Sequence, residues 1–435
     1  MHLFIAVLFS ILSFASEPVT CVGVINSFPT DDKNLWVIGE HEIAQDKNTV
    51  FADGIAVEGN LAKVTYVEED GVKVAKEIRV LPIQAATLSD GPYIIRKSKG
   101  IYVAISYVDG KVLREPLTLH EGMYEFTTRF PEVKKIRVNP NPPNIPSSTV
   151  ELPIKLLAIS DLEGHLDHLT AFLQKHGVID EHYDWTWGTN HLLFNGDSVD
   201  RGSRVTELLW FIRKLQQQAR RIGGDVHFII GNHEAMILCD DLRYLHPKYE
   251  FIINELNIPY PTLFNMTSVL GHWMRAQNAI VQVGPYLFVH AGYSPRLLEL
   301  NMSHSELNSA IRKTLRPPAW GDRENLKTSL AWHRQGPLWF RGYFNKHLET
   351  YGPKPTSEEI DAILETHNAT AIFVGHTVVD HIGYLDGDKR LVCIDVKWSK
   401  DGKGEGLLIE GDSMSRLTMH SDTPLELTSN DTSAE

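Results

Sequence analysis

The sequence predicts an α/β domain that follows a small all-β domain, with a proline-rich connector between them. Three observations support this fold class. Residues 20–138 hold short runs in which apolar and polar residues alternate, without a helix-period stretch of useful length. Residues 139–149 concentrate prolines and asparagines. From residue 152 to about 418, continuous apolar runs of strand length alternate with helix-period segments, which is typical of α/β folds.

The first domain is predicted to be a small β-sandwich of antiparallel strands. Its alternating runs include LAKVTYVEE from Leu61, EIRVLPI from Glu77 and IYVAISYV from Ile101. Asp109-Gly110 stands between two such runs and predicts a two-residue hairpin turn. The segment NPNPPNIPSS that follows has four prolines, so we expect a semi-rigid, extended linker that marks the domain boundary. The first domain contains no catalytic constellation that its sequence reveals.

The second domain begins with IKLLAIS, which reads as a buried strand because all but two of its residues are apolar. Helix-period patterns predict helices up to about residue 176, over 204–221 and over 358–367. Further strands are expected in HLLFNG, VHFIIG, IVQV, YLFVH, AIFVG, RLVCIDV and GLLIEG. The tail at residues 419–435 is polar and is predicted to be disordered.

The chain of 435 residues has a net charge of −13, 43% hydrophobic residues and 22% charged residues. This composition is typical of a soluble globular protein. The acidic balance argues against non-specific nucleic-acid binding, which needs Lys and Arg to neutralise phosphates. A phosphorylated substrate is not excluded, because bound metal ions reverse the local field.

The first residues resemble a secretory signal. The run from Leu3 to Phe14 is apolar but too short to span a bilayer comfortably, and Ser13 and Ala15 fit a small-x-small cleavage pattern. We therefore expect a cleaved signal peptide over residues 1–16, a secreted or periplasmic location, and no transmembrane helix in the mature chain. An uncleaved anchor and a misread start remain open, because no Lys or Arg precedes the apolar run.

Five short motifs occur in a fixed order, each directly after an apolar run that reads as a strand. They are SDLEGH at 160–165, NGDSVDRG at 195–202, GNHE at 231–234, VHAG at 289–292 and VGHT at 374–377. Asp, Glu, Asn and His are the ligands that hard-to-borderline divalent metals need. Strand ends at one edge of a sheet are where α/β proteins place their sites. The ordered set therefore predicts a dinuclear metal site.

Residues 154 to about 410 resemble the calcineurin-like metallophosphoesterase superfamily, and the resemblance rests above all on the motifs GDSVDRG and GNHE. Within this superfamily these residues are most similar to bacterial-type phosphoprotein phosphatases, the Shewanella-like phosphatase and diadenosine tetraphosphate hydrolase branches. The resemblance implies an αββα sandwich of two packed mixed sheets flanked by helices, and it does not cover the first 150 residues. It also implies two divalent metal ions and hydrolysis by a metal-activated water without a covalent phosphoenzyme. Manganese is the favoured metal, with Mg, Fe, Zn or Ca as alternatives.

The resemblance also implies the metal ligands. Asp197 matches the bridging aspartate and Asp161 the aspartate of the first motif, while the amide and imidazole ligands are Asn232, His290 and His376.

The first motif departs from the family's usual Asp-x-His, because Glu163 stands where the histidine would bind the first metal. Carboxylate is harder than imidazole, so Glu163 as a ligand favours Mn²⁺, Mg²⁺ or Ca²⁺ over softer ions. Two alternatives stay open. His165 supplies the nitrogen instead, or the first metal binds weakly or not at all.

The resemblance assigns the remaining catalytic roles. His233 is the candidate general acid, and Asp200 would hold its imidazolium charged and oriented. Arg201 would bind phosphate oxygens with its planar, permanently charged fork. A second arginine is expected between VHAG and VGHT; Arg341 is our choice and Arg334 the competitor.

The leading functional hypothesis is a metal-dependent phosphomonoesterase, with a phosphorylated protein or small molecule as its partner and phosphoserine, phosphothreonine or phosphotyrosine as candidate targets. The first alternative is a hydrolase of nucleotide phosphoanhydrides or phosphodiesters. The second is a catalytically weak protein that binds phosphate ligands, in which Glu163 has impaired the first metal. After His376 the chain has no SAPNY-type loop, which fits the bacterial-type branches. The sequence does not fix the oligomeric state.

Overall fold

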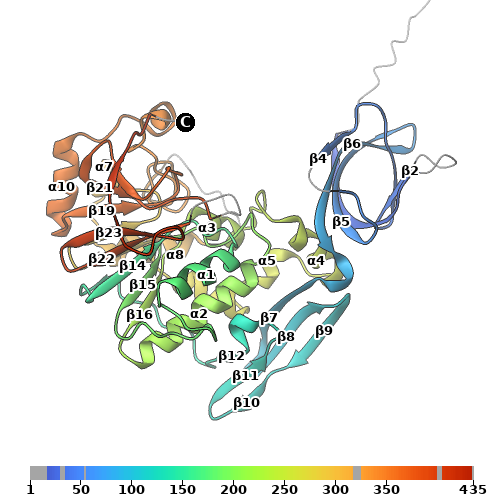
Figure 1. The fold of residues 1–435 in the computed structure, drawn as a ribbon, viewed down its shortest axis with the longest axis horizontal. Coiled ribbons are helices and arrows are strands. Elements are labelled where there is room, and N and C mark those ends of the chain that lie inside the picture. Colours follow the sequence, from blue (N-terminus) through green and yellow to red (C-terminus); the bar gives the residue numbers. More distant parts are fainter. Residues whose placement is uncertain (1–16, 30–34, 53–54, 317–324, 399–403, 434–435) are drawn as a thin grey trace, which may run out of the picture. The chain divides into compact units, whose positions relative to one another are not determined.

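A computed structural model describes residues 17–29, 35–52, 55–316, 325–398 and 404–433 (Figure 1). The chain forms two compact units. Of the described residues, those from 17 to 89 together with 107–111 and 250–255 form the smaller unit, and those within 90–106, 112–249 and 256–433 form the larger. The predicted signal peptide, residues 1–16, lies outside the described residues. Within the described ranges, no helix is both long and apolar enough to cross a membrane.

The smaller unit is built on one six-stranded sheet in the order β3-β2-β1-β5-β6-β4. Its strands are β1 (Val19–Ser27), β2 (Leu35–Ile38), β3 (His41–Ala44), β4 (Val50–Ala52), β5 (Asn60–Glu69) and β6 (Val72–Gln84). Ala44 of β3 also pairs with Val74 of β6, so the sheet curls and closes on itself. Ile38, Val64 and Ile78 are among the buried residues of its core. The all-β prediction is confirmed, but a single curled sheet replaces the expected sandwich.

The boundary between the units differs from the predicted one at residues 139–149, because the strands after Ser89 belong mainly to the larger unit. They form two three-stranded sheets, one of β7 (Ser89–Ser98), β8 (Ile101–Val108) and β9 (Lys111–Pro116), the other of β10 (Thr118–His120), β11 (Met123–Thr127) and β12 (Lys135–Val138). Trp210 Nε1 donates to the carbonyl of Pro92 at 2.9 Å, and Thr206 Oγ1 lies 3.2 Å from the hydroxyl of Tyr93. These contacts attach β7 to a helix that lies more than 100 residues further along the sequence. Local periodicity cannot reveal a contact between segments so far apart in the chain.

The larger unit contains two further mixed sheets (Figure 1). The seven-stranded sheet has the order β13-β17-β18-β19-β21-β20-β25, and the six-stranded sheet has the order β16-β15-β14-β22-β23-β24. Their strands are β13 (Thr149–Val150), β14 (Lys155–Ile159), β15 (His191–Phe194), β16 (Asp225–Phe228), β17 (Ile280–Val283), β18 (Tyr286–Val289), β19 (Ala371–Val374), β20 (Gly383–Leu385), β21 (Asp388–Cys393), β22 (Glu405–Glu410), β23 (Ser413–Thr418), β24 (Leu425–Glu426) and β25 (Thr428–Asn430).

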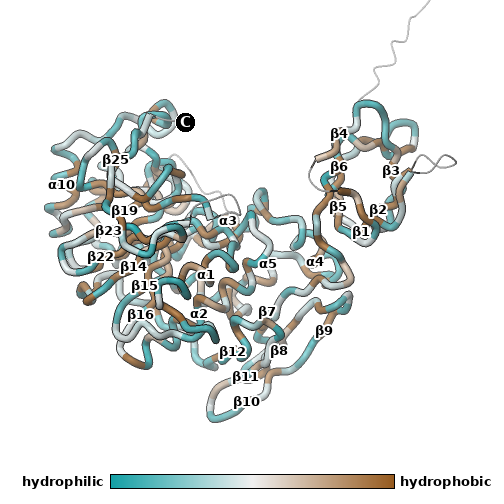
Figure 2. The backbone as a smooth tube through the Cα atoms, in the orientation of Figure 1, coloured by the Kyte–Doolittle hydropathy of each residue, from teal (hydrophilic) through white to brown (hydrophobic). Residues whose placement is uncertain are grey.

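One apolar cluster lies between these two sheets. It joins Leu156 and Leu193 from the six-stranded sheet to Phe288, Phe373 and Val392 from the seven-stranded sheet, all of them buried. Hydrophobic residues follow the strands of the larger unit in Figure 2. The predicted sandwich of two packed mixed sheets is confirmed.

Helices flank the sandwich, with α2 packed against β16 and α8 against β17. The helices of the chain are α1 (Leu166–Lys175), α2 (Val205–Arg221), α3 (Asn232–Leu238), α4 (Pro247–Leu256), α5 (Tyr260–Leu263), α6 (Val269–Ala276), α7 (Pro295–Leu298), α8 (His304–Thr314), α9 (Leu348–Tyr351) and α10 (Ser357–His367). α10 begins at a capping box in which Thr356 and Glu359 satisfy free backbone N–H groups, and it ends at Asn368 in the left-handed conformation.

The tail is ordered as far as residue 433, so its predicted disorder was wrong for the described part. β25 pairs in parallel with β20, and Asp386 accepts hydrogen bonds from the backbone N–H and the hydroxyl of Thr432 at 2.9 and 2.6 Å. Pairing with an edge strand stabilises a segment through its backbone groups, which is why a polar composition did not prevent order here.

Candidate metal centre and active site

The five motifs meet because the strands before them are neighbours in the two sheets. β14, β15 and β16 run parallel to one another, and so do β18 and β19. The loops after the carboxyl ends of these strands therefore carry the candidate site. Six of its residues have left-handed backbone conformations, namely Asp161, Glu163, Asp197, Asp200, Arg201 and His376. Such conformations cost energy in non-glycine residues and cluster where geometry is imposed for function.

Two motif glycines are required by close packing around the carboxylates. A methyl group on Gly231 of GNHE would overlap the backbone N and Oδ1 of Asp197. A methyl group on Gly375 of VGHT would overlap the Oδ2 of Asp161 and the hydroxyl of Ser160. The loops can approach this closely only without side chains at these two positions.

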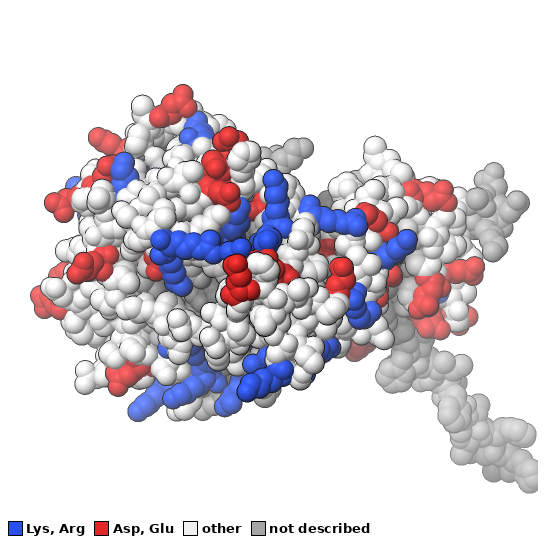
Figure 3. All heavy atoms as spheres, turned by 90° about the horizontal axis from the view of Figure 1, so that it is seen from below, with Lys and Arg blue, Asp and Glu red and all other residues white. Residues whose placement is uncertain are grey.

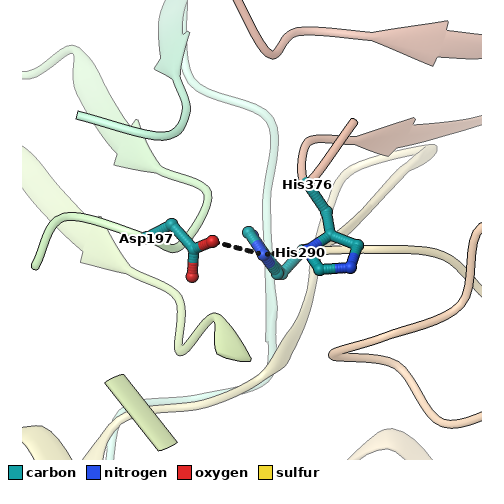
Figure 4. Close-up of side chains that lie close together, drawn as sticks. All are labelled: Asp197, His290 and His376. Atoms are coloured by element: carbon teal, nitrogen blue, oxygen red, sulfur yellow. Dashed lines mark hydrogen bonds and ion pairs between the residues drawn. The ribbon is translucent and has the colours of Figure 1, made fainter. Parts of the chain in front are cut away.

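His290 lies at the centre of a set of buried polar atoms (Figure 4). Its Nε2 is 3.1 Å from Asp197 Oδ2, 2.9 Å from Asn232 Oδ1 and 3.2 Å from His376 Nδ1. One N–H serves three acceptors poorly, whereas several lone pairs that face one point suit a cation. Asp197, His290 and His376 each offer a ligand atom within 4.8 Å of the others. Carboxylate, imidazole and amide oxygen together fit a divalent transition metal.

The carboxylates near this point also fit a metal. Burial and the nearby Asp197 raise the pKa of Asp161 to about 6. Burial and Asp161 raise the pKa of Asp395 well above its ordinary value. Buried like charges of this kind are normally offset by a positive partner. Nothing in the donor set disagrees with the metals that the motifs predict.

Backbone hydrogen bonds hold Asp197 and its loop in place. Asp197 Oδ1 accepts from the backbone N–H of His233 at 2.9 Å. The carboxylate of Glu234 accepts from the backbone N–H groups of Gly231, Asp197 and Ser198 at 2.7–2.9 Å. Glu234 thereby ties the GNHE loop to the GDSVDRG loop, a positioning role that sequence reasoning missed.

His233 and Asp200, the candidate general acid and its partner, lie in contact. Nδ1 of His233 lies 2.7 Å from Asp200 Oδ2, and both side chains are buried. Burial lowers the pKa of His233, but the carboxylates of Asp197 and Asp200 outweigh it and raise the pKa. Nε2 of His233 lies 3.8 Å from Asp197 Oδ2, on the side of the candidate metal ligands. The arrangement therefore favours the protonated form of this imidazole beside that site.

Glu163 forms an ion pair with the guanidinium of Arg201. The structure thus joins a predicted metal ligand to a predicted phosphate-binding group, and the ligand role of Glu163 stays a prediction. His165, the alternative ligand, directly precedes α1 and packs edge-on against the ring of His168.

The two arginine candidates after VHAG differ in their surroundings. Arg334 is bonded outside the site, since its Nη1 donates to the carbonyl of Thr350 at 3.1 Å. Burial lowers the pKa of the His376 imidazole, and the nearby charge of Arg341 lowers it further. The buried Nε of Arg341 has no hydrogen-bond partner among the described residues. These surroundings favour Arg341.

Tyr244 is a further site residue that the sequence did not single out. Its ring lies 5.0 Å from the ring of His233 and 5.0 Å from the guanidinium of Arg201. Tyr244 is 42% exposed, so it forms an accessible wall beside the buried His233 and the exposed Arg201, two candidate catalytic groups. No periodicity or motif marks it; the only local signal is an aromatic residue soon after GNHE.

The profile of the calcineurin-like phosphoesterase family matches residues 154–380, just over half of the chain. The chain belongs to this family. As a calcineurin-like phosphoesterase it is a metal-dependent hydrolase of phosphoric esters.

Three proteins illustrate what this phosphoesterase is similar to. The crystal structure of a cold-active protein-tyrosine phosphatase from a psychrophilic Shewanella species is 29% identical, with a TM-score of 0.70, and the match covers 79% of this chain and 100% of that one. Shewanella-like protein phosphatase 1 of Plasmodium berghei is 27% identical over 51% of this chain and 61% of its own length. The symmetrical bis(5'-nucleosyl)-tetraphosphatase of Neisseria meningitidis is 30% identical over 32% of this chain and 44% of its own length.

Proposed function

We propose that this phosphoesterase is a protein phosphatase that hydrolyses phosphate monoesters with two divalent metal ions. The observation that carries the proposal is the convergence of Asp197, Asn232, His290 and His376 beside the His233–Asp200 pair. Two of the similar proteins described above are named protein phosphatases, which supports this substrate class.

The metal ligands divide into two groups around Asp197. Asn232, His290 and His376 would hold one ion, while Asp161 and Glu163 would contribute to the other. When bound, the ions would supply Lewis-acid chemistry, polarising the phosphate and activating a water for attack on phosphorus. Carboxylates disfavour the softer ions, and the imidazoles of His290 and His376 disfavour Mg²⁺ and Ca²⁺, so the mixed ligand set favours manganese among the candidate metals.

The chain's own residues bind the phosphate and handle the proton. Arg201 and Arg341 bind phosphate oxygens, with Arg201 leaving Glu163 to do so. His233 donates a proton to the leaving oxygen, and Asp200 keeps the imidazole charged and oriented for that step. The ring of Tyr244 offers an aromatic surface next to His233, on which the ring of a phosphotyrosine leaving group can pack.

The substrate class is tested by comparing kcat/KM for phosphotyrosyl peptides, phosphoseryl peptides and diadenosine tetraphosphate. We expect the phosphopeptides to be preferred by at least tenfold, with phosphotyrosine above phosphoserine because of Tyr244. Tyr244→Leu should reduce the phosphotyrosine preference and leave phosphoserine turnover within about threefold. A preference for the dinucleotide would instead favour the nucleotide hydrolase alternative.

We also propose that residues 1–16 direct export of the chain to a secreted or periplasmic location. The apolar run from Leu3 to Phe14 supports this proposal. Mass spectrometry of the chain recovered from its native source should find a new N-terminus near Ser16; an intact Met1 in the mature chain would contradict it.

A further inference from the structure

A pocket in the larger unit carries positive charge and has no acidic residue in its wall. Its volume is about 260 Å³, and Arg96, Arg213 and His272 line it together with Tyr102, Trp273 and the asparagine- and proline-rich segment 138–144. None of the candidate metal or catalytic residues contributes to it. The chain as a whole has a net charge of −13, although Lys and Arg side chains do gather on parts of its surface (Figure 3). A wall without Asp or Glu is therefore notable.

Arg213 is the central feature of this pocket. It lies on α2, and its guanidinium stacks over the ring of Trp210 at 5.4 Å. Its Nη1 is buried, and no acceptor from the described part of the chain lies within hydrogen-bonding distance of it. Burial alone lowers the pKa of Arg213 to about 10, without a contribution from any carboxylate, so the group is still charged at neutral pH. Burying a charged donor without a partner costs free energy, which an anion would offset.

The neighbours of Arg213 add to the preference for an anion. Burial lowers the pKa of His272, and the nearby charge of Arg96 lowers it further. The permanent positive charges of Arg96 and Arg213 therefore share the pocket with a neutral imidazole. Asn139, Asn141 and Asn144 add amide groups to the same wall. Arginine forks match the oxygens of phosphate and carboxylate groups in paired hydrogen bonds. The charge and donor types thus select an oxyanion.

The size of the pocket limits what the oxyanion can be attached to. A volume of about 260 Å³ compares with about 30 Å³ for one water in the liquid, so a phosphate group fits with part of its carrier. Tyr102 and Trp273 supply apolar surface for that carrier. From these features we propose that the pocket is a second oxyanion site, separate from the metal centre, that binds the phosphate group of a phosphorylated ligand without hydrolysing it.

The stoichiometry of inorganic phosphate binding tests this proposal. Calorimetric titration of the metal-loaded full chain should show two phosphates per chain. In Arg213→Met the event outside the metal centre should weaken at least tenfold. Arg96→Met provides a second, independent variant in case Arg213→Met does not fold. Arg221→Met is the matched control, because Arg221 lies on the same helix but does not line the pocket.

Turnover of p-nitrophenyl phosphate should stay within about twofold of the wild-type value in all three variants, since none of these arginines belongs to the proposed active site. Repeating the titrations with a phosphonate-bearing peptide distinguishes a free phosphate from a phosphorylated protein segment as the ligand. Tighter pocket binding of the peptide assigns the site to protein segments, whereas tighter binding of inorganic phosphate assigns it to the free ion. One phosphate per chain in wild type, or unchanged binding in both Arg213→Met and Arg96→Met, would overturn the proposal.

Discussion

At the scale of single residues, His290 concentrates the chemistry of the site. Its Nδ1 lies 2.8 Å from the carbonyl of Asn195, which orients the ring, and its Nε2 faces three potential ligand groups. A histidine whose second nitrogen is held by a backbone carbonyl is a common arrangement for a metal ligand. The position of His290 beside the other motif side chains was predictable, because the order of the motifs marks which histidines follow the strands. Tyr244 and Asp395 were not, since only the folded chain brings them beside the motifs.

The Asp200→Asn substitution should move the alkaline limb of the pH–rate profile. His233 must be protonated to donate, so activity should fall as pH rises through its pKa, which the carboxylates raise. Removing the charge of Asp200 lowers that pKa, and the limb should shift to lower pH, with kcat reduced roughly 10²-fold. The measurement is kcat against pH for both proteins. An unshifted limb would remove His233 from the role of general acid.

Glu163→His tests the unusual first motif. If Glu163 is a ligand, imidazole in its place should move the preferred activating metal from Mn²⁺ towards the softer Zn²⁺ or Fe²⁺. Activity with each metal in turn, together with metal content, provides the measurement. An unchanged metal profile would restrict Glu163 to its ion pair with Arg201.

At the scale of elements, the strands and the loops that carry motifs followed from the sequence, because buried strands of a sandwich leave continuous apolar runs. β14, β15, β16 and β19 all lie where such runs predicted them. The conformation of the loops did not follow from periodicity. Six site residues adopt left-handed conformations that only tertiary packing imposes.

Gly231→Ala should impair the site more than the fold. The added methyl group meets the backbone and carboxylate of Asp197 and must displace one of the two loops. We expect a loss of about 1–3 kcal/mol in the free energy of unfolding, by analogy with overpacking, and a loss of most of the bound metal. Denaturant unfolding and metal content measure the two effects. Gly223→Ala offers a contrast, because its Cβ would make only an ordinary contact with Thr189, although its left-handed backbone adds strain. Full metal retention in Gly231→Ala would show that the two loops are not packed as described.

At the scale of the whole molecule, the sequence predicted the class of each part better than its boundaries. The all-β region and the α/β sandwich were both expected, but residues 90–106 and 112–138 belong to the larger unit. The buried cluster of Asp90, Lys248 and Glu207 explains part of this assignment, since Lys248 Nζ lies 3.0 Å from Asp90 Oδ1 and 3.6 Å from Glu207 Oε1. Removing one partner of a buried ion pair costs free energy of folding. The strand β7, which carries Asp90, is therefore held to α2 through Lys248 by charge as well as by packing. Charged residues distant in sequence give no local signal of their pairing.

The measurement that tests the central claim most directly is phosphate release from p-nitrophenyl phosphate by the wild-type chain and by Asp197→Asn. Mn²⁺, Mg²⁺, Ca²⁺, Zn²⁺ and Fe²⁺ are supplied one at a time, and circular dichroism checks that both proteins are folded. Metal-dependent turnover that Asp197→Asn lowers by several orders of magnitude, with its fold retained, is the expected result. Near wild-type turnover in Asp197→Asn would contradict a catalytic metal centre built on Asp197.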